Sequence, residues 1–151
     1  MTLRRLLAGA LLALMAMGTA VAQEPNGYFR DLERSDSPND WLIAPAGFPG
    51  EPDAEAPVFD VSAERLGELF EAVAKAEGAE EVTARGEDLL CVVAVTSLLG
   101  FEDDVCAQFI VLEAGRSTLA LYSASREGYW DLGANRARLE DWLSQIAALA
   151  H

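Results

Sequence analysis

Two segments of the chain repeat their hydrophobic positions with the period of an amphipathic helix. The apolar positions recur three and four residues apart, which places them on one face. They are Leu66, Leu69, Phe70 and Val73 in the first segment, and Leu139, Trp142, Leu143, Ile146 and Leu149 in the second. Ser62 is a good N-cap for the first helix, which Gly78 ends, and Asn135 is the expected N-cap of the last helix.

Apolar runs separated by short polar breaks predict the strands. They cover residues 58–61, 81–84, 89–98, 105–112 and 117–123, with turns at 101–104 and 114–115. The elements follow the order β-α-β-β-β-β-α. This order predicts an α+β fold, in which an antiparallel sheet of about four to five strands carries two helices packed on one face.

The N-terminal 22 residues have the pattern of a secretory signal peptide. Arg4 and Arg5 precede an apolar run, and Ala20-Val21-Ala22 forms a cleavage site with small residues. We therefore expect an exported protein, periplasmic or secreted, that keeps no membrane span after cleavage. An uncleaved anchor is the alternative, although the 17 residues from Leu6 to Ala22 are short for a span.

Residues 23–56 form a Pro-rich segment that we expect to be extended and partly docked on a single α+β domain over residues 57–150. Proline interrupts helices and sheet ladders, and this stretch and Pro57 together hold all six prolines. The apolar patch Trp41-Leu42-Ile43 is expected to dock as a short extended piece. The stretch before Ser35 is expected to be mobile.

The chain is strongly acidic. Its formal net charge of −14 becomes −16 once the signal peptide removes two arginines and no acidic residue. A phosphate backbone is bound by Lys and Arg, so this charge argues against nucleic acid as a partner. It also makes any local cluster of arginines conspicuous.

The two cysteines, Cys91 and Cys106, are expected to be buried thiols rather than a disulfide. If the two strands are joined near Gly100 to Asp103, the two cysteines lie about 15 Å out of register along neighbouring strands. A disulfide requires Cα atoms within about 7 Å of each other. An oxidising compartment nevertheless permits the bridge, which leaves it as the alternative.

The inventory of side chains excludes most familiar catalytic machinery. The only histidine is the terminal residue His151, so catalysis by Ser-His-Asp or Cys-His and zinc sites built on His are not expected. We expect no metal and no cofactor. The acidic run Glu102-Asp103-Asp104 is interpreted as a solvated turn that neutralises a neighbouring arginine.

The remaining constellation joins the last strand to the last helix. Its candidate ligand-binding residues are Ser123, Ser125, Arg126, Tyr129, Asp131, Asn135, Arg136 and Arg138. Guanidinium groups beside a helix N-terminus suit an anionic ligand. The competing interpretation, favoured in so acidic a chain, is a structural ion network in which Asp131, Asp103 and Asp104 neutralise the arginines.

This constellation resembles domain-of-unknown-function family 1499, an uncharacterised family of exported bacterial proteins. The resemblance extends over about residues 37–147 and implies no activity, because the family has no established one. The matching residues are Ser123, Ser125-Arg126, Gly128, Asp131, Gly133, Asn135-Arg136 and Arg138, with Gly100-Phe101, Asp103-Asp104-Val105, Ser37-Pro38-Asn39 and Trp41-Leu42 upstream.

Three functions are consistent with these patterns. The favoured one is a non-catalytic envelope binding or interaction module, whose partner is an envelope protein or a small anionic ligand at the Arg-rich junction 126–138. The second is a hydrolase that uses carboxylates and arginines on a small anionic or sugar substrate. The third is a purely structural or envelope-assembly protein with the Trp41 patch as its contact surface.

Overall fold

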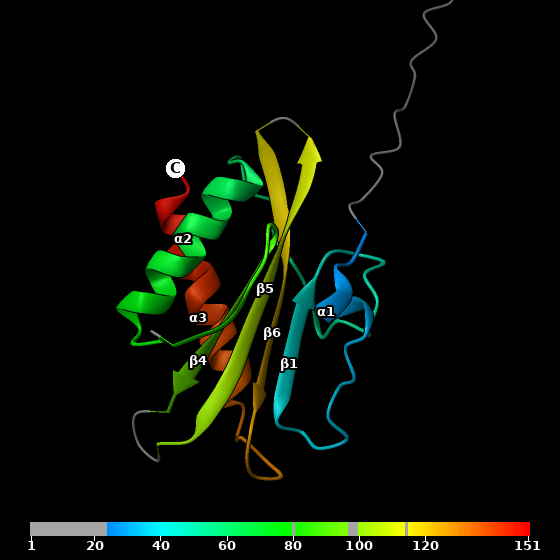
Figure 1. Cartoon of the computed structure of the whole chain (residues 1–151), viewed down its shortest axis with the longest axis vertical. Helices are drawn as coiled ribbons and strands as arrows, with labels where there is room; N and C mark the ends of the chain where they lie inside the picture. The colour runs from blue at the N-terminus through cyan, green and yellow to red at the C-terminus, as the bar shows by residue number, and fades with distance from the viewer. Residues whose placement is uncertain (1–23, 80, 97–99, 114) are drawn as a thin grey trace, which may run out of the picture.

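A mixed six-stranded sheet lies at the centre of the computed structural model, which describes residues 24–79, 81–96, 100–113 and 115–151 (Figure 1). The predicted signal peptide lies outside these residues. The strand order is β2-β1-β6-β5-β4-β3, with β1 and β2 parallel and the other neighbours antiparallel. The strands are β1 (Asp40–Ala44), β2 (Ala54–Glu55), β3 (Glu81–Arg85), β4 (Leu89–Val95), β5 (Glu102–Glu113) and β6 (Arg116–Ser125).

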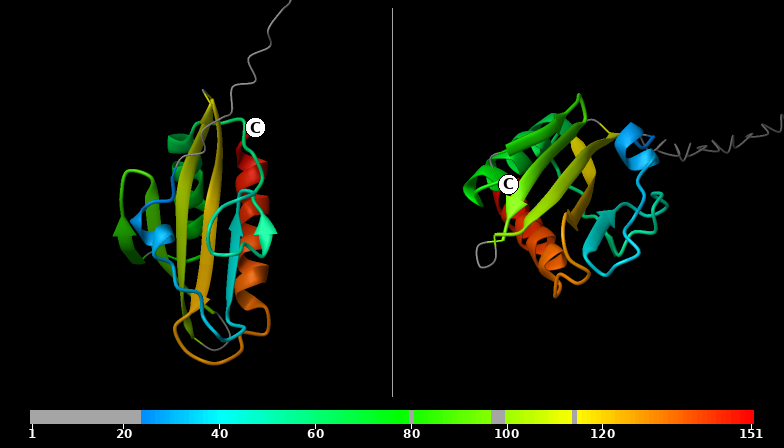
Figure 2. Two further views of the ribbon diagram at one scale, coloured as in Figure 1. Left: turned by 90° about the vertical axis from the view of Figure 1, so that its right-hand side faces the viewer. Right: turned by 60° about the horizontal axis from the view of Figure 1, so that its bottom comes forward.

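Three helices flank this sheet. Helices α2 (Ala63–Ala76) and α3 (Ala134–Leu149) cover one face, while the short α1 (Gly27–Arg30) lies on the other side (Figures 1 and 2). The α+β class is confirmed, whereas the numbers of four to five strands and two helices are too low. No helix within the described residues is both long and apolar enough to cross a membrane.

Strand β5 supplies side chains to a hydrophobic cluster on each face of the sheet. Val105, Ala107 and Phe109 pack in the cluster beneath α2 and α3. Cys106 and Ile110 point the other way, into the cluster that includes Phe29 of α1. Because successive side chains of a strand alternate between faces, β5 is apolar on both sides and reads as a continuous hydrophobic run.

Helix α2 forms as the sequence predicts. The Ser62 side chain accepts a hydrogen bond from the Arg65 N–H at 3.1 Å, which satisfies one of the unpaired donors of the first turn. Gly78 follows the end of the helix with φ +82°, a backbone conformation that glycine adopts without steric cost. The four predicted apolar positions are buried. The centroids of the Phe70 ring and of the Trp142 ring of α3 lie 5.8 Å apart.

The Pro-rich segment contributes more structure than the sequence predicts. The Trp41 patch forms β1, which pairs with β6 along the sheet. Before Ser35, where a mobile stretch was expected, α1 buries Phe29 to 1% exposure. The predicted strand at 58–61 is wrong, because Phe59 makes only a single bridge to Ser117 before Ser62 starts the next helix.

The acidic run Glu102-Asp103-Asp104 begins strand β5 instead of forming the predicted turn. The last pair of the β4–β5 hairpin is Val95 with Glu102, so the connection lies earlier in the chain than expected. Residues 97–98 of the predicted strand lie outside the described residues. Three consecutive acids are stable in a strand here because arginines from beyond β6 neutralise them.

This earlier turn corrects the prediction for the cysteines. In the observed register Cys91 lies directly opposite Cys106, with their Cα atoms 4.1 Å apart, and the two form a disulfide. The expected offset of about 15 Å depended on the misplaced turn. The bridge joins two central strands in the cluster on the α1 face.

Loss of this disulfide is expected to destabilise the domain. Closing a loop of this size restricts the unfolded chain by about 3 kcal/mol, so the Cys91→Ala/Cys106→Ala variant should unfold at a clearly lower urea concentration. The native protein, denatured without reductant, should show no reactive thiol towards Ellman's reagent. Detection of two thiols would contradict the bridge.

A charged cluster fixes the N-terminal segment to the sheet. Arg34 lies 2.7 Å from both Asp40 and Asp53, and the Tyr122 hydroxyl donates to Asp40 at 2.8 Å. Burial raises the pKa of Asp40, but the hydrogen bonds from Arg34 and Tyr122 outweigh it, so the net pKa is lowered. The carboxylate therefore contributes stability that depends on its being ionised.

The stability of the domain is expected to fall in acid partly through Asp40. A lowered native pKa gives stabilisation that is complete above the unfolded pKa, near pH 4, and is lost as the pH falls through the native value. The Arg34→Gln variant should lose part of this pH dependence, measured as the urea midpoint between pH 7 and pH 3. In the control variant Arg65→Gln, which breaks an exposed pair with Glu68, the dependence should persist.

Candidate functional site

The junction between β6 and α3 is built around the buried side chain of Asn135. Its amide nitrogen lies 2.8 Å from the Asn39 carbonyl, 2.9 Å from Ser125 Oγ and 2.8 Å from an Asp131 carboxylate oxygen. Its carbonyl oxygen accepts from the Ser123 hydroxyl. Asn135 thus ties β1, β6 and α3 together, whereas the sequence predicts only a helix cap at this position.

Asp131 occupies the N-terminus of α3. Gly133, not Asn135, is the N-cap, and it lacks a side chain that could cap the helix. The Asp131 carboxylate instead accepts hydrogen bonds from the backbone N–H groups of Gly133 at 2.8 Å and Asn135 at 3.0 Å. The anion-binding position at this helix end is therefore filled by the chain's own carboxylate.

Arg138 and Asp103 form a buried ion pair below this cap. The two groups are 2.5 Å apart, and their side chains are 12% and 1% exposed. Arg138 also lies 3.0 Å from the Asn135 carbonyl oxygen and 3.2 Å from Ser123 Oγ. These additional hydrogen bonds offset part of the cost of burying the Arg138 charge.

The other two arginines of the junction also have carboxylate partners. Arg126 binds both oxygens of Asp104 and donates to Glu102 at 2.5 Å, and these contacts, first with Asp104 and then with Glu102, raise its pKa. Arg136 lies 2.8 Å from Glu140 and stacks over the Trp41 ring at 5.1 Å. These contacts support the structural ion network over an open anion pocket.

Large side chains project into solvent from the loop above this network. Tyr129, Trp130 and Leu132, which we name the apolar tip, are 72%, 66% and 75% exposed. The base of the loop is held because the Asn39 side chain donates to the Gly128 carbonyl at 2.7 Å. The loop lies at the end of the sheet where β6 finishes (Figure 1).

Leu132 is the most unusual residue of the apolar tip. Its φ of +57° lies in the left-handed region, which a bulky side chain rarely adopts. Sequence reasoning included Tyr129 among the candidates and missed Trp130, Leu132 and the amide of Asn39. The available signal was the run of aromatic and aliphatic residues between two glycines, Gly128 and Gly133, in an otherwise polar loop.

The junction offers little for acid–base or metal chemistry. Asp104 is engaged by an arginine and Asp131 by backbone N–H groups. Asp103 binds Arg138 through one oxygen, and its other oxygen is buried without a hydrogen-bond partner among the described residues. Within the part of the chain that the structure describes, no group of three or more His, Cys, Asp or Glu side chains is placed to hold a metal ion. The arrangement is that of a rigid support for a loop.

These features define a small α+β domain whose β6–α3 junction is held by a buried polar network. The chain belongs to the family described as "Protein of unknown function (DUF1499)", whose model matches residues 19–146. Comparisons with curated proteins and with solved structures gave no match.

The ion pair between Arg138 and Asp103 is expected to be essential for stability. Arg138→Met leaves an unpaired buried carboxylate, which should lower the free energy of unfolding by about 3–5 kcal/mol. The exposed pair of Arg136 and Glu140 offers the control, since Arg136→Met should cost at most about 1 kcal/mol. If urea denaturation shows the same loss of unfolding free energy for Arg138→Met and Arg136→Met, the buried pair is no more important for stability than the exposed one.

Proposed function

We propose that the protein is an exported, non-catalytic interaction module that contacts an envelope protein through the apolar tip. The observation that carries the proposal is the exposure of Tyr129, Trp130 and Leu132 on a loop whose base is fixed. Aromatic side chains held in this way dominate protein interfaces, because they bury a large area at little entropic cost.

The strained backbone of Leu132 supports the same conclusion. A left-handed conformation costs a bulky residue about 1 kcal/mol, and folding gains nothing from a leucine that is three-quarters exposed. Strain that the core does not require is typical of residues with a functional role. We infer that the backbone presents the leucine to a partner.

The contacts of the junction disfavour the alternative of a hydrolase. Its carboxylates would have to leave Arg126, Arg138 or the N-terminus of α3 before one could act as a general base. A small anion would likewise have to displace a carboxylate from an arginine. A protein partner at the apolar tip requires neither exchange.

Two features support export. The first 22 residues have the composition of a signal peptide. A disulfide joins Cys91 and Cys106, and such bonds persist in oxidising compartments.

Removal of the apolar tip is expected to abolish partner binding without unfolding the domain. The Tyr129→Ser/Trp130→Ser variant and the wild type would be immobilised and exposed to envelope extract from the producing cells. Each anchoring aromatic that is lost weakens an interface by about 2 kcal/mol or more. The amount of a true partner captured by the variant, measured by quantitative mass spectrometry, should therefore fall more than tenfold. The Arg136→Gln/Glu140→Gln variant, altered beside the loop, should retain it.

A second variant separates binding from stability. Leu132→Gly should raise the free energy of unfolding by up to about 1 kcal/mol, because glycine accepts the left-handed backbone, while it weakens partner capture. The proposal is wrong if the captured proteins are the same for the wild type and both tip variants.

A further inference from the structure

The apolar tip lies at the same end of the sheet as a second pair of exposed hydrophobic side chains. Val95 ends β4 and Phe101 directly precedes β5, and their side chains are 54% and 45% exposed. We name these two residues the hairpin pair. Of the nine large hydrophobic side chains that are exposed in the described part of the chain, the tip and the hairpin pair supply five, and the others are Val58, Val82, Val111 and Leu149. Exposed hydrophobic side chains therefore concentrate at this end.

Hydrogen bonds hold the two loops of this end together at their bases. The backbone N–H of Arg126 donates to the Glu102 carbonyl at 3.0 Å, and its guanidinium group contacts the carboxylates of Glu102 and Asp104. Arg126 opens the loop that carries the apolar tip, while Glu102 directly follows Phe101. Both loops lie at the lower end of the sheet in Figure 1. One arginine thus fixes the two loops to each other.

Phe101 is exposed on a backbone that is itself held in place. Its N–H donates to Thr96 Oγ1 at 3.0 Å, and its carbonyl accepts from the Thr96 N–H at 2.9 Å. The loop of the apolar tip is held in the same manner by the bond from Asn39 to the Gly128 carbonyl. Aromatic side chains on a fixed backbone lose little conformational entropy when a partner covers them. Both loops therefore offer the same kind of contact.

Carboxylates outnumber arginines around these hydrophobic side chains. Glu102 and Asp104 share Arg126, and Glu127 adds a third carboxylate on the exposed part of the loop. One base and three acids leave a charge of 1 − 3 = −2 at this place. A negative surface repels a second copy of this acidic chain and an anionic lipid surface, and it attracts a positively charged protein.

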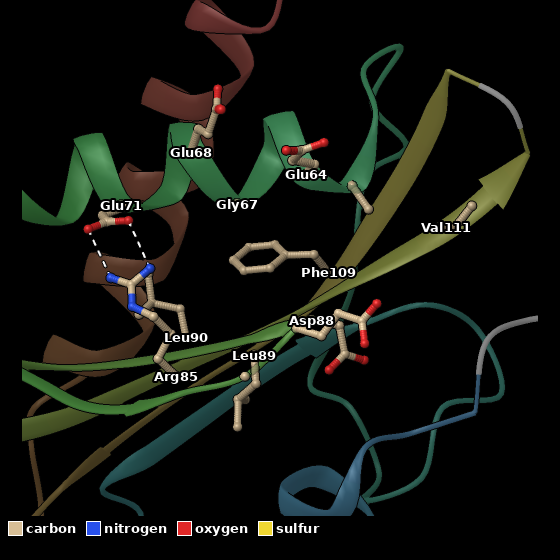
Figure 3. A pocket seen from close by; sticks show the side chains of 13 residues that line it. Glu64, Gly67, Glu68, Glu71, Arg85, Asp88, Leu89, Leu90, Phe109 and Val111 are labelled. Atoms are coloured by element: carbon tan, nitrogen blue, oxygen red, sulfur yellow. Dashed lines mark hydrogen bonds and ion pairs between the residues drawn. The ribbon is translucent and has the colours of Figure 1, made fainter.

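The acidic groove between α2, the β3–β4 hairpin and β5 shows the contrast (Figure 3). There Arg85 binds both oxygens of Glu71, at 3.0 and 3.2 Å. The Phe109 ring of the groove is 7% exposed, and a Cβ added at Gly67 would come within 3.3 Å of it. The groove thus combines its charge with a buried ring, so its exposed residue Glu87 can serve as a control for charge alone.

We propose that the apolar tip and the hairpin pair form one docking surface for a protein that has an apolar cleft with a basic rim. This inference rests on the proposed function and deepens it, because it adds a second loop to the surface and assigns the charge of the partner. The cleft covers the aromatic and aliphatic side chains, and Lys or Arg side chains of its rim face Glu102, Asp104 and Glu127. A hydrophobic centre with a polar rim is the usual anatomy of a protein interface.

Site-specific photo-cross-linking in the producing cells tests whether one partner covers both loops. The photoreactive amino acid p-benzoylphenylalanine is placed at Phe101, at Trp130 or, as the control, at Val58, which is exposed near the start of β6 at the other end of the sheet. Mass spectrometry should identify the same protein from positions 101 and 130, and not from 58. A partner linked from position 130 alone refutes the shared surface and leaves the proposed function standing, whereas the absence of a cross-link from both positions contradicts both.

Point variants then test the ring and the charge separately, by calorimetric titration of the partner that cross-linking identifies. Phe101→Ser should weaken binding about fivefold or more without lowering the urea midpoint, because the lost ring is an exposed interface contact. Glu127→Gln should weaken binding roughly twofold to threefold in dilute buffer and less in about 0.5 M NaCl, which screens the charge. Glu87→Gln removes the same charge at the β3–β4 turn and should bind like the wild type.

Four results would overturn the proposal. Unchanged affinity of Phe101→Ser excludes the second loop from the surface. Equal affinities of Glu127→Gln and Glu87→Gln exclude the basic rim. A cross-link to a second copy of the chain replaces the basic partner by a homodimer, and sedimentation of the purified protein with phosphatidylcholine vesicles replaces it by a lipid surface.

Discussion

The architecture depends on the buried amide of Asn135. A carboxamide without access to water must find partners within the protein, and the chain supplies them from β1, β6, the loop and α3. The start of β1, 96 residues away in the sequence, and the consecutive segments of the β6–α3 junction are thereby fixed at one point. The ion pair of Arg138 and Asp103 adjoins the same amide, so charge and hydrogen bonding reinforce each other.

The elements with a strong local period could be predicted, and those that depend on distant partners could not. Helices α2 and α3 follow from the spacing of apolar residues, which records the face that each helix buries. Strand β1 depends on pairing with β6 about 80 residues later. The start of β5 was misplaced because the acids Glu102–Asp104 have the composition of a turn until the arginines that neutralise them are taken into account.

Much the same is true of the candidate site. The sequence indicated that the arginines of the junction lie near acidic residues, but not which acid meets which arginine. It gave Asn135 the role of a cap because asparagine is common there, whereas Asp131 caps the helix from a left-handed turn that no local pattern reveals. Within the described residues, seven arginines form ion pairs, which explains how a few bases hold so acidic a chain together.

The strand order also has a consequence for the timing of folding. During synthesis the N-terminal end emerges first, yet β1 lies between β2 and β6 and pairs with a strand that ends at Ser125. The sheet is therefore incomplete until most of the chain is available, and early collapse of the N-terminal part alone gains few native contacts. A chain of this topology can place its N-terminal strand in the sheet only after β6 has been synthesised, so β1 forms late although it is made early.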